Sequence, residues 1–289
     1  HTPTPAKEIG TSHVQFRLHP KYKRVKYPGA AVNYPNIQTA ARRRRQSMAY
    51  QTYQTTTRTG DAALAGFMRQ VFNYMTGGVA VSGLVAWLTM NTPSLMALAA
   101  TPVTAILNLV IWLGFGFLAH KIMFKLQPTA GLATFAAFSA WTGFALAPLV
   151  YMYTGASVTI AFFTAAIMFG GASLYGYTTN KSLSSWGTFL MLGMFGLIGA
   201  VLINVGLSFF GINTGPLSFI TSLIAVPLIA AVTAYETNML KETHYALQQQ
   251  GDDAATRARV GIIGAVGLYT SFVALFVNLL QLLGQRDNG

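Results

Sequence analysis

Glu236 is the residue whose position in this sequence most strongly suggests chemistry. It lies near the end of an apolar stretch, residues 216–240, and of the seven acidic residues it alone falls inside an apolar segment. A carboxylate in hydrocarbon costs several kcal/mol unless it is protonated, paired or hydrated. Glu236 is therefore a candidate site for a proton or a cation.

A second interpretation places Glu236 at the membrane edge, where its side chain reaches water. The 20 residues from Pro216 to Glu236 make about 30 Å of helix at about 1.5 Å per residue, which is about the thickness of the hydrocarbon core. The length of the stretch is compatible with both interpretations.

The composition indicates what surrounds this carboxylate. The chain has 289 residues, of which 53% are hydrophobic and 9% are charged. Soluble domains carry about 25% charged residues, so most of this chain has no aqueous surface to cover. There is no cysteine, which excludes disulfides and thiolate metal sites. We therefore expect an all-α integral membrane protein that crosses the lipid bilayer several times.

Seven apolar stretches are each about long enough to cross a bilayer. They fit helices, because a backbone exposed to lipid must satisfy its hydrogen bonds within the segment. The seven predicted transmembrane helices are residues 67–90, 102–124, 130–152, 157–178, 186–210, 216–240 and 259–284. Because the connectors between the spans are short, they leave no room for a separate soluble domain. We therefore expect one transmembrane domain over residues 66–284 and a short C-terminal tail over 285–289.

Residues 1–65 are polar and show no helical or strand period, so we expect a basic, disordered tail. Residues 1–47 hold ten Lys/Arg and one Glu, and one hypothesis is that they extend a chain that naturally begins at Met48. The arginines from Arg42 to Arg45 suit contact with anionic lipid, or they anchor the first helix by the positive-inside rule. No nucleic-acid partner is expected.

Basic residues alternate between the connectors. The connectors after the second, fourth and sixth stretches carry Lys or Arg, whereas those after the first, third and fifth carry no charge. Cytoplasmic loops are enriched in Lys and Arg, so the pattern predicts a cytoplasmic N-terminus.

Two prolines lie inside predicted spans, Pro148 in the third and Pro227 in the sixth. Each removes a backbone donor and can kink its helix. A kink at Pro227, nine residues before Glu236, would free carbonyl groups close to the carboxylate and loosen that helix for movement. The alternative is an incidental bend.

Motifs of several enzyme classes are absent from the sequence. There is no H-E-x-x-H zinc motif and no glycine-rich phosphate loop. An aspartyl intramembrane protease needs two apposed carboxylates, and a retinal protein needs a lysine in the last span; neither is present. We expect no enzymatic activity, and no cofactor beyond weak calcium or proton binding at Glu236.

Three stretches carry a family resemblance. They are SLYGYTTNKSLSSWGTFL (residues 173–190), AYETNMLKE (234–242) and GLYTSFVALFVNLLQLLG (267–284). From about residue 61 to 284 the chain resembles the Bax inhibitor family, the transmembrane Bax-inhibitor-motif proteins, in its bacterial form. The resemblance implies six helices around a central seventh and a location in the bacterial inner membrane.

For characterised members, the resemblance implies a pH-sensitive calcium leak that is latched by two aspartates sharing a proton. Glu236 matches the first position, and the second falls on Ser271, next to Thr270. A hydroxyl from Ser271 would favour ionised Glu236, whereas burial would oppose ionisation, and the sequence leaves both open. These three residues would make only a weak calcium site, because calcium prefers several oxygen ligands, more than one of them charged.

Two functions follow as expectations. One is a calcium or proton leak, or a stress-protective membrane protein, with Glu236 as the gate and Ser271 as its hydrogen-bond partner. The other, by family analogy alone, is a non-conducting modulator of other membrane proteins, such as quality-control proteases. The retained carboxylate favours the leak, and the missing second carboxylate favours the modulator.

Overall fold

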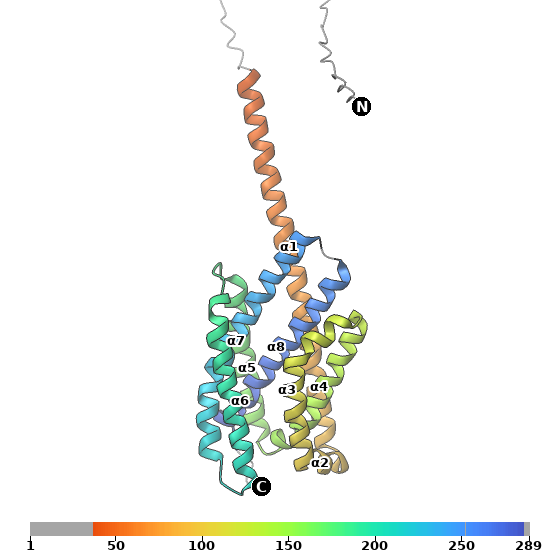
Figure 1. Cartoon of the computed structure of the whole chain (residues 1–289), viewed down its shortest axis with the longest axis vertical. Coiled ribbons are helices and arrows are strands. Elements are labelled where there is room, and N and C mark those ends of the chain that lie inside the picture. The colour runs from red at the N-terminus through yellow and green to blue at the C-terminus, as the bar shows by residue number, and fades with distance from the viewer. Residues whose placement is uncertain (1–36, 252, 286–289) are drawn as a thin grey trace, which may run out of the picture. The chain divides into compact units, whose positions relative to one another are not determined.

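In the computed structural model, residues 37–251 and 253–285 are described, and for residues 37–45, 47–61, 117, 120 and 209 only the backbone is described. The chain divides into two compact units, residues 1–55 and 56–289. All regular structure in the described residues is helical (Figure 1). The elements are α1 (Ile37–Met90), α2 (Pro93–Ala99), α3 (Pro102–Lys125), α4 (Pro128–Tyr151), α5 (Gly155–Thr178), the 3-10 helix η1 (Ser184–Trp186), α6 (Gly187–Phe209), α7 (Gly215–Gln250) and α8 (Ala254–Leu283).

The second predicted span, residues 102–124, coincides with α3, but the short helix α2 precedes it in the predicted connector, residues 91–101. Among the described residues, six helices are long and apolar enough to cross a membrane, or seven if the bent pair α2 and α3 counts as one span. The two helices of this pair meet at 66°. The break falls at Thr101, whose extended backbone precedes Pro102 and whose side chain accepts a hydrogen bond from the Thr104 amide. A residue before proline avoids the helical conformation, so a new helix begins there.

The start of α1 corrects a second expectation. Residues 37–65, which we expected to lack regular structure, belong to this helix. The reason is local: no proline follows Pro35 in this region, and 15 of its 29 residues are alanines, arginines or glutamines, which are good helix formers. Residues 1–36 and the side chains of Arg42 to Arg45 lie outside the described residues, so the expected lipid contact stays a prediction.

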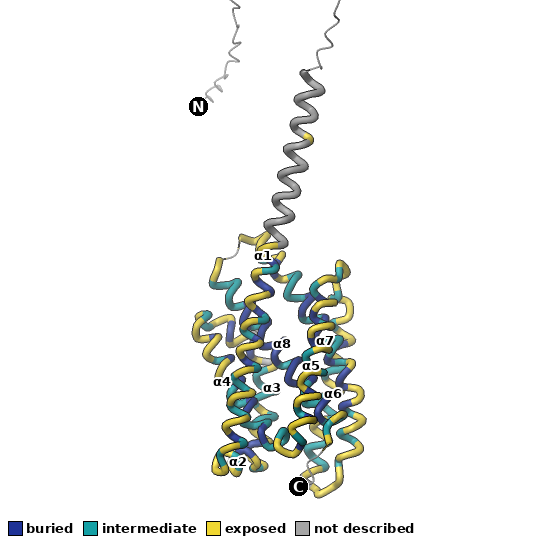
Figure 2. The backbone as a smooth tube through the Cα atoms, turned by 180° about the vertical axis from the view of Figure 1, so that it is seen from behind, coloured by how far each residue is buried: buried dark blue, intermediate teal, exposed yellow. Residues whose placement is uncertain are grey.

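Helix α8 is the most deeply buried of the six described helices that are long and apolar enough to cross a membrane (Figure 2). In its most apolar stretch 67% of the residues are buried, against 6% in the span that contains α6. It packs against α3, α4, α5 and α7, and its Gly261 faces Phe67 and Val71 of α1. Helix α6 packs against α7. The core of residues 56–289 is therefore arranged around α8.

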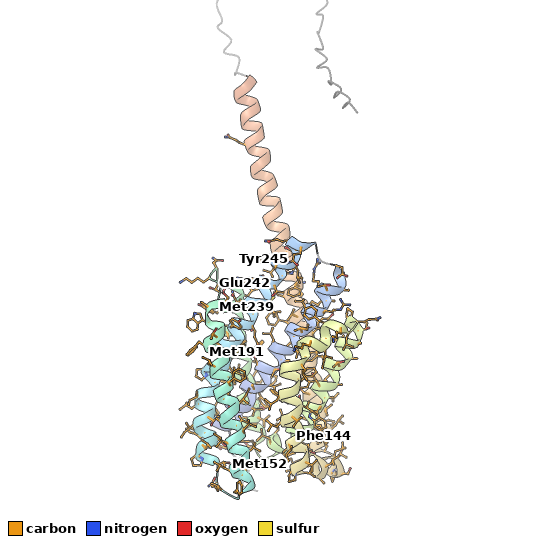
Figure 3. All side chains as sticks on the ribbon, viewed as in Figure 1. Phe144, Met152, Met191, Met239, Glu242 and Tyr245 are labelled. Carbon is orange, nitrogen blue, oxygen red and sulfur yellow. The ribbon has the colours of Figure 1, made fainter. Side chains whose placement is uncertain are left out.

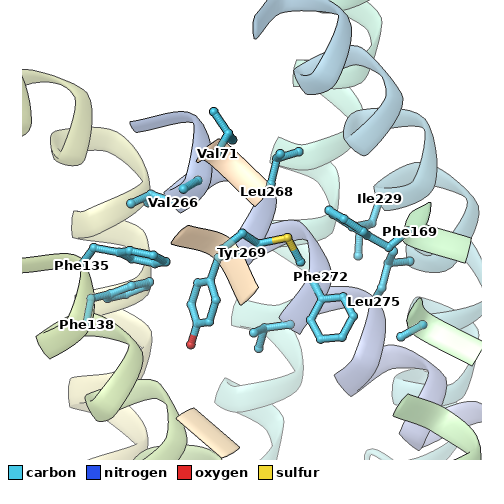
Figure 4. Close-up of a cluster of buried hydrophobic side chains, with 14 of the residues drawn as sticks. Val71, Phe135, Phe138, Phe169, Ile229, Val266, Leu268, Tyr269, Phe272 and Leu275 are labelled. Atoms are coloured by element: carbon cyan, nitrogen blue, oxygen red, sulfur yellow. The ribbon is translucent and has the colours of Figure 1, made fainter. Parts of the chain in front are cut away.

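Aromatic rings connect α8 to its neighbours (Figure 4). The Tyr269 ring meets Phe135 and Phe138 of α4 edge to face, at centroid distances of 5.3 and 5.9 Å. On another face of α8, Phe272 meets Phe169 of α5 at 5.7 Å in the same geometry. Edge-to-face contacts of this kind add about 0.5–1.5 kcal/mol beyond the burial of apolar area.

Charged side chains hold the helix ends on one side of this unit, where Glu242 and Tyr245 lie, opposite to Met152 (Figure 3). Arg259 Nε donates to the Leu126 carbonyl at the C-terminus of α3, at 2.9 Å. A cation at this position also offsets the negative end of the helix dipole. At the start of α8, Asp253 is hydrogen-bonded by the Thr256 side chain and by the Thr256 amide, and these two hydrogen bonds hold the pKa of this carboxyl below its usual range.

Candidate functional site on helices α7 and α8

The Glu236 carboxylate is held between two helices. The side chain is partly buried on α7 and faces α8, where Ser271 Oγ donates a hydrogen bond to Glu236 Oε2 at 2.8 Å. Ser271 itself is buried, with 6% of its surface exposed. The hydrogen-bond partner expected from the sequence is therefore present, and the carboxylate is anchored to a neighbouring helix.

Gly267 makes room for this carboxylate. A Cβ atom at Gly267 would lie 3.3 Å from Glu236 Oε1 and 3.6 Å from its Cδ. Gly267 and Ser271 are four residues apart and share one face of α8. One turn earlier, Gly264 receives the Leu240 side chain from α7. This glycine-lined face of α8 is what allows a long acidic side chain to lie flat against it.

Among the described residues, Thr270 makes no hydrogen bond to Glu236 or Ser271. Its hydroxyl donates to the Val266 carbonyl of its own helix, at 2.8 Å. The site therefore offers a cation one carboxylate and one hydroxyl, and the described residues contain no group of three or more His, Cys, Asp or Glu that could hold a metal. This ligand set is poor for calcium.

The two prolines lie inside helices, Pro148 in α4 and Pro227 in α7, and both helices continue through them. Pro227 is exposed. The nine residues to Glu236 correspond to about 13.5 Å of helix and about half a turn of rotation, so the two side chains lie on opposite faces. The carbonyl left without a donor belongs to Leu223, still farther from the site. Pro227 thus does not present free carbonyls to the carboxylate.

Asn238 was not singled out from the sequence, yet it makes the most long-range hydrogen bonds near the site. The side chain is 1% exposed. Its Oδ1 accepts from the Leu183 amide at 2.9 Å, and its Nδ2 donates to the Gly176 carbonyl at 3.2 Å. The nearby Lys241 Nζ also binds this region, because it donates to the carbonyls of Tyr177, at 3.0 Å, and Thr179. Through Asn238 and Lys241, helix α7 is therefore hydrogen-bonded to the end of α5 and to the connection that leads to η1.

Replacing Asn238 by alanine should loosen this connection. The change leaves the Leu183 amide and the Gly176 carbonyl without their side-chain partner, at about 1–3 kcal/mol for each buried group. We expect a lower Tm and faster hydrogen exchange around Leu183. As a matched control, Asn278 donates to the Ala274 carbonyl of its own helix and to no other described residue, so its change to alanine should have a much smaller effect. Equal effects would contradict the role assigned to Asn238.

A second polar pair lies on the same helix interface. Ser222 Oγ of α7 donates to Gln281 Oε1 of α8 at 2.8 Å. Ser222 precedes Glu236 by fourteen residues, or about 21 Å along α7. Polar side chains thus join α7 and α8 at two depths of the membrane span.

The three stretches that carry the family resemblance meet around Glu236. Asn238 and Lys241, from 234–242, bind backbone groups of 173–190. Glu236, from the same stretch, binds Ser271 of 267–284. Segments separated by up to about one hundred residues therefore form a single site.

Comparison with known proteins agrees with this pattern. The family model described as "Inhibitor of apoptosis-promoting Bax1" matches residues 64–288. The chain is 32% identical to inner membrane protein YbhL of Escherichia coli strain K12, over 78% of this chain and 94% of that protein. It is 35% identical to an uncharacterised protein of Caulobacter vibrioides, over 78% of this chain and 90% of the relative.

These matches confirm the resemblance noted in the sequence. The family model covers all seven predicted spans. The helices, the site between α7 and α8 and the family match lie in the same part of the chain. This chain is a multi-pass membrane protein that belongs to the Bax inhibitor family.

Proposed function

We propose that the protein is a proton-controlled cation leak of the bacterial inner membrane, conducting protons or calcium, with Glu236 and Ser271 closing the interface between α7 and α8. The observation that carries the proposal is the 2.8 Å hydrogen bond between a membrane carboxylate and a hydroxyl on the most buried helix. An acidic side chain in a membrane helix is costly and marks ion or proton pathways in general.

The hydrogen bond suggests how closure depends on protonation. When Glu236 is neutral, the Ser271 hydroxyl and the packing around Gly267 suffice to hold the side chain between the helices. When Glu236 is ionised, one hydroxyl does not compensate for the loss of hydration, so water or a cation must enter. Entry of water between α7 and α8 would open a path past Glu236, and protonation would close it again.

The proposal includes a complete topology. Counting α2 and α3 as one bent span gives seven crossings, with α8 at the centre and the N-terminus in the cytoplasm. The basic residues support this orientation, because Lys181, Lys241 and Arg259 all lie near helix ends of the same side. The proposal requires no enzymatic step and no cofactor.

Ion flux from liposomes tests the proposal. The full chain is reconstituted with an enclosed pH dye or calcium dye, and efflux is compared at acidic and alkaline pH. Wild-type protein should leak faster at alkaline pH, because Glu236 is then ionised. Glu236→Gln should lose most of this pH dependence, and Ser271→Ala should leak more at both pH values. Glu242→Gln, which changes an acid near the end of α7 outside the pair, serves as the control.

Two results would count against the leak. If Glu236→Gln and wild type leak identically at both pH values, the proposed gate is wrong. If neither conducts, the alternative gains support, in which the protein binds other membrane proteins such as quality-control proteases. The surface of α6 favours that alternative, because it is little buried and its Gly196 and Gly199 face open space.

A further inference from the structure

A groove lies between α5, η1, α6 and α7, apart from the Glu236–Ser271 pair. It encloses a cavity of about 300 Å³, at the lower end of the range of about 300–1,000 Å³ that is usual for ligand pockets. The lining consists of five larger side chains and four alanines: Tyr175, Leu183, Trp186, Leu190, Tyr235, Ala172, Ala230, Ala231 and Ala234. Tyr175 and Trp186 are each 56% exposed, so the groove opens outward toward the surrounding lipid.

This lining suits a hydrocarbon chain. The side chains are apolar or aromatic, and the short alanines leave space that larger residues would fill. Trp and Tyr are enriched where hydrocarbon meets the lipid headgroups. Tyr175 lies three residues before the end of α5, and Trp186 directly precedes α6. The groove therefore lies at the level where an acyl chain continues into a headgroup.

The connection beside this groove, residues 179–183, carries a cation. Lys181 is the only charged residue of the sequence between Lys125 and Glu236. Its side chain is exposed and makes no ion pair with another described residue. Leu183, two residues later, lines the groove. The Lys181 ammonium is therefore available for an anionic group at this end of the groove.

The hydrogen bonds of Asn238 and Lys241 hold this connection in place. Asn238 binds the Leu183 amide at 2.9 Å and the Lys181 carbonyl at 3.4 Å, and Lys241 Nζ binds the Thr179 carbonyl. The backbone on both sides of Lys181 is thus attached to α7, while its side chain stays exposed. A ligand that binds here does not have to order the backbone first, which lowers the cost of binding.

We infer that the groove binds one membrane phospholipid, with an acyl chain along the alanines and aromatic rings and the phosphate beside Lys181. A lysine ammonium binds phosphate through charge-assisted hydrogen bonds, and basic pockets between transmembrane helices bind lipid headgroups. Glu242 follows Tyr235 by seven residues, about 10 Å along α7, so a headgroup with several negative charges matches less well. A phosphodiester with one negative charge, as in phosphatidylethanolamine, fits this arrangement.

Native mass spectrometry of the full chain in mild detergent tests the headgroup contact, with phosphatidylethanolamine and diacylglycerol of the same acyl chains as probes. Wild type should bind one phosphatidylethanolamine about tenfold more tightly than diacylglycerol, the ratio that about 1.4 kcal/mol gives. Lys181→Gln should remove this preference, because the phosphate loses its partner. Lys125→Gln, at the end of α3, is the matched control and should keep it. Equal binding of both lipids by wild type, or an unchanged preference in Lys181→Gln, would overturn the inference.

Ala231→Phe tests the acyl-chain contact, because the larger side chain fills the groove. Binding of both lipids should fall several-fold. Ala136→Phe is the control, since Ala136 is exposed on α4 and is not part of the groove; this variant should bind as wild type does. If the two variants bind lipid equally well, the acyl chain does not occupy the groove. Lys181 is exposed, so its variant gives a result even if Ala231→Phe fails to fold. Neither measurement depends on ion flux, so failure of the leak proposal leaves both readable.

Discussion

Replacing Gly143 by valine is expected to prevent α1 and α4 from packing and to remove most of the folded protein. A Cβ atom built on Gly143 would overlap the carbonyl group of Ser82, which is backbone and cannot rotate away. Overpacking with flexible side chains costs about 1–3 kcal/mol, and a clash with backbone costs more because a whole helix must shift. The yield of monodisperse protein and its Tm measure the effect. Gly176→Val should behave alike, because its Cβ would overlap the Ala234 carbonyl of α7.

Gly196→Val is the matched control for these substitutions. Gly196 lies in the interior of α6, and no atom of another described residue lies within 4 Å of a Cβ atom built at this position. The same change of residue should therefore leave yield and Tm nearly unaltered. If Gly143→Val proves as stable as Gly196→Val, then α1 and α4 do not approach each other as closely as the structure shows.

Ser271→Asp is expected to make stability strongly dependent on pH. The new carboxylate would lie next to Glu236, because the Ser271 Oγ and Glu236 Oε2 atoms are 2.8 Å apart. Two unit charges about 4 Å apart interact by about 4 kcal/mol at an effective dielectric constant of about 20. At acidic pH the pair can share a proton and a hydrogen bond, whereas at alkaline pH both groups ionise and repel. The Tm should therefore fall as the pH rises.

Ser271→Asn is the control that distinguishes the effect of a second negative charge from the effect of a larger side chain. Asparagine is close in size to aspartate and can donate to Glu236 at every pH, so its Tm should show no comparable decline toward alkaline pH. A Ser271→Asp protein whose Tm follows that of Ser271→Asn across the whole range would mean that the two side chains do not face each other. Comparing the two variants by flux would also show whether repulsion at this position opens the leak.

The sequence predicted the features that depend on residues close together along the chain. Seven apolar stretches predict helices that cross a bilayer, because each segment in lipid must satisfy its own backbone. The isolation of Glu236 in residues 216–240 marks the site for the same reason, since a carboxylate there stands out against its own neighbours. Two features were not predicted: the short helix α2, which a bend at Thr101 and Pro102 separates from α3, and the helical structure of residues 37–65 at the start of α1.

The pairing of Glu236 with Ser271 was anticipated through the family resemblance, which placed the two positions opposite each other. Composition and spacing would not have found it, because the residues are 35 positions apart and α8 presents several other polar groups. The same limit explains why Asn238 was overlooked. The role of Asn238 depends on its hydrogen bonds to Gly176 and Leu183, which lie in a different part of the sequence.

The sequence by itself determined that the chain spans a membrane. It also determined that one acidic side chain, Glu236, lies within an apolar segment and must be protonated, paired or hydrated there. The tertiary structure decided which groups meet that need: Gly267 opens the space, Ser271 supplies the proton for the hydrogen bond, and burial of α8 keeps both near the carboxylate. Helix formation in lipid depends on neighbours along the chain, whereas these contacts depend on how helices far apart in sequence pack together.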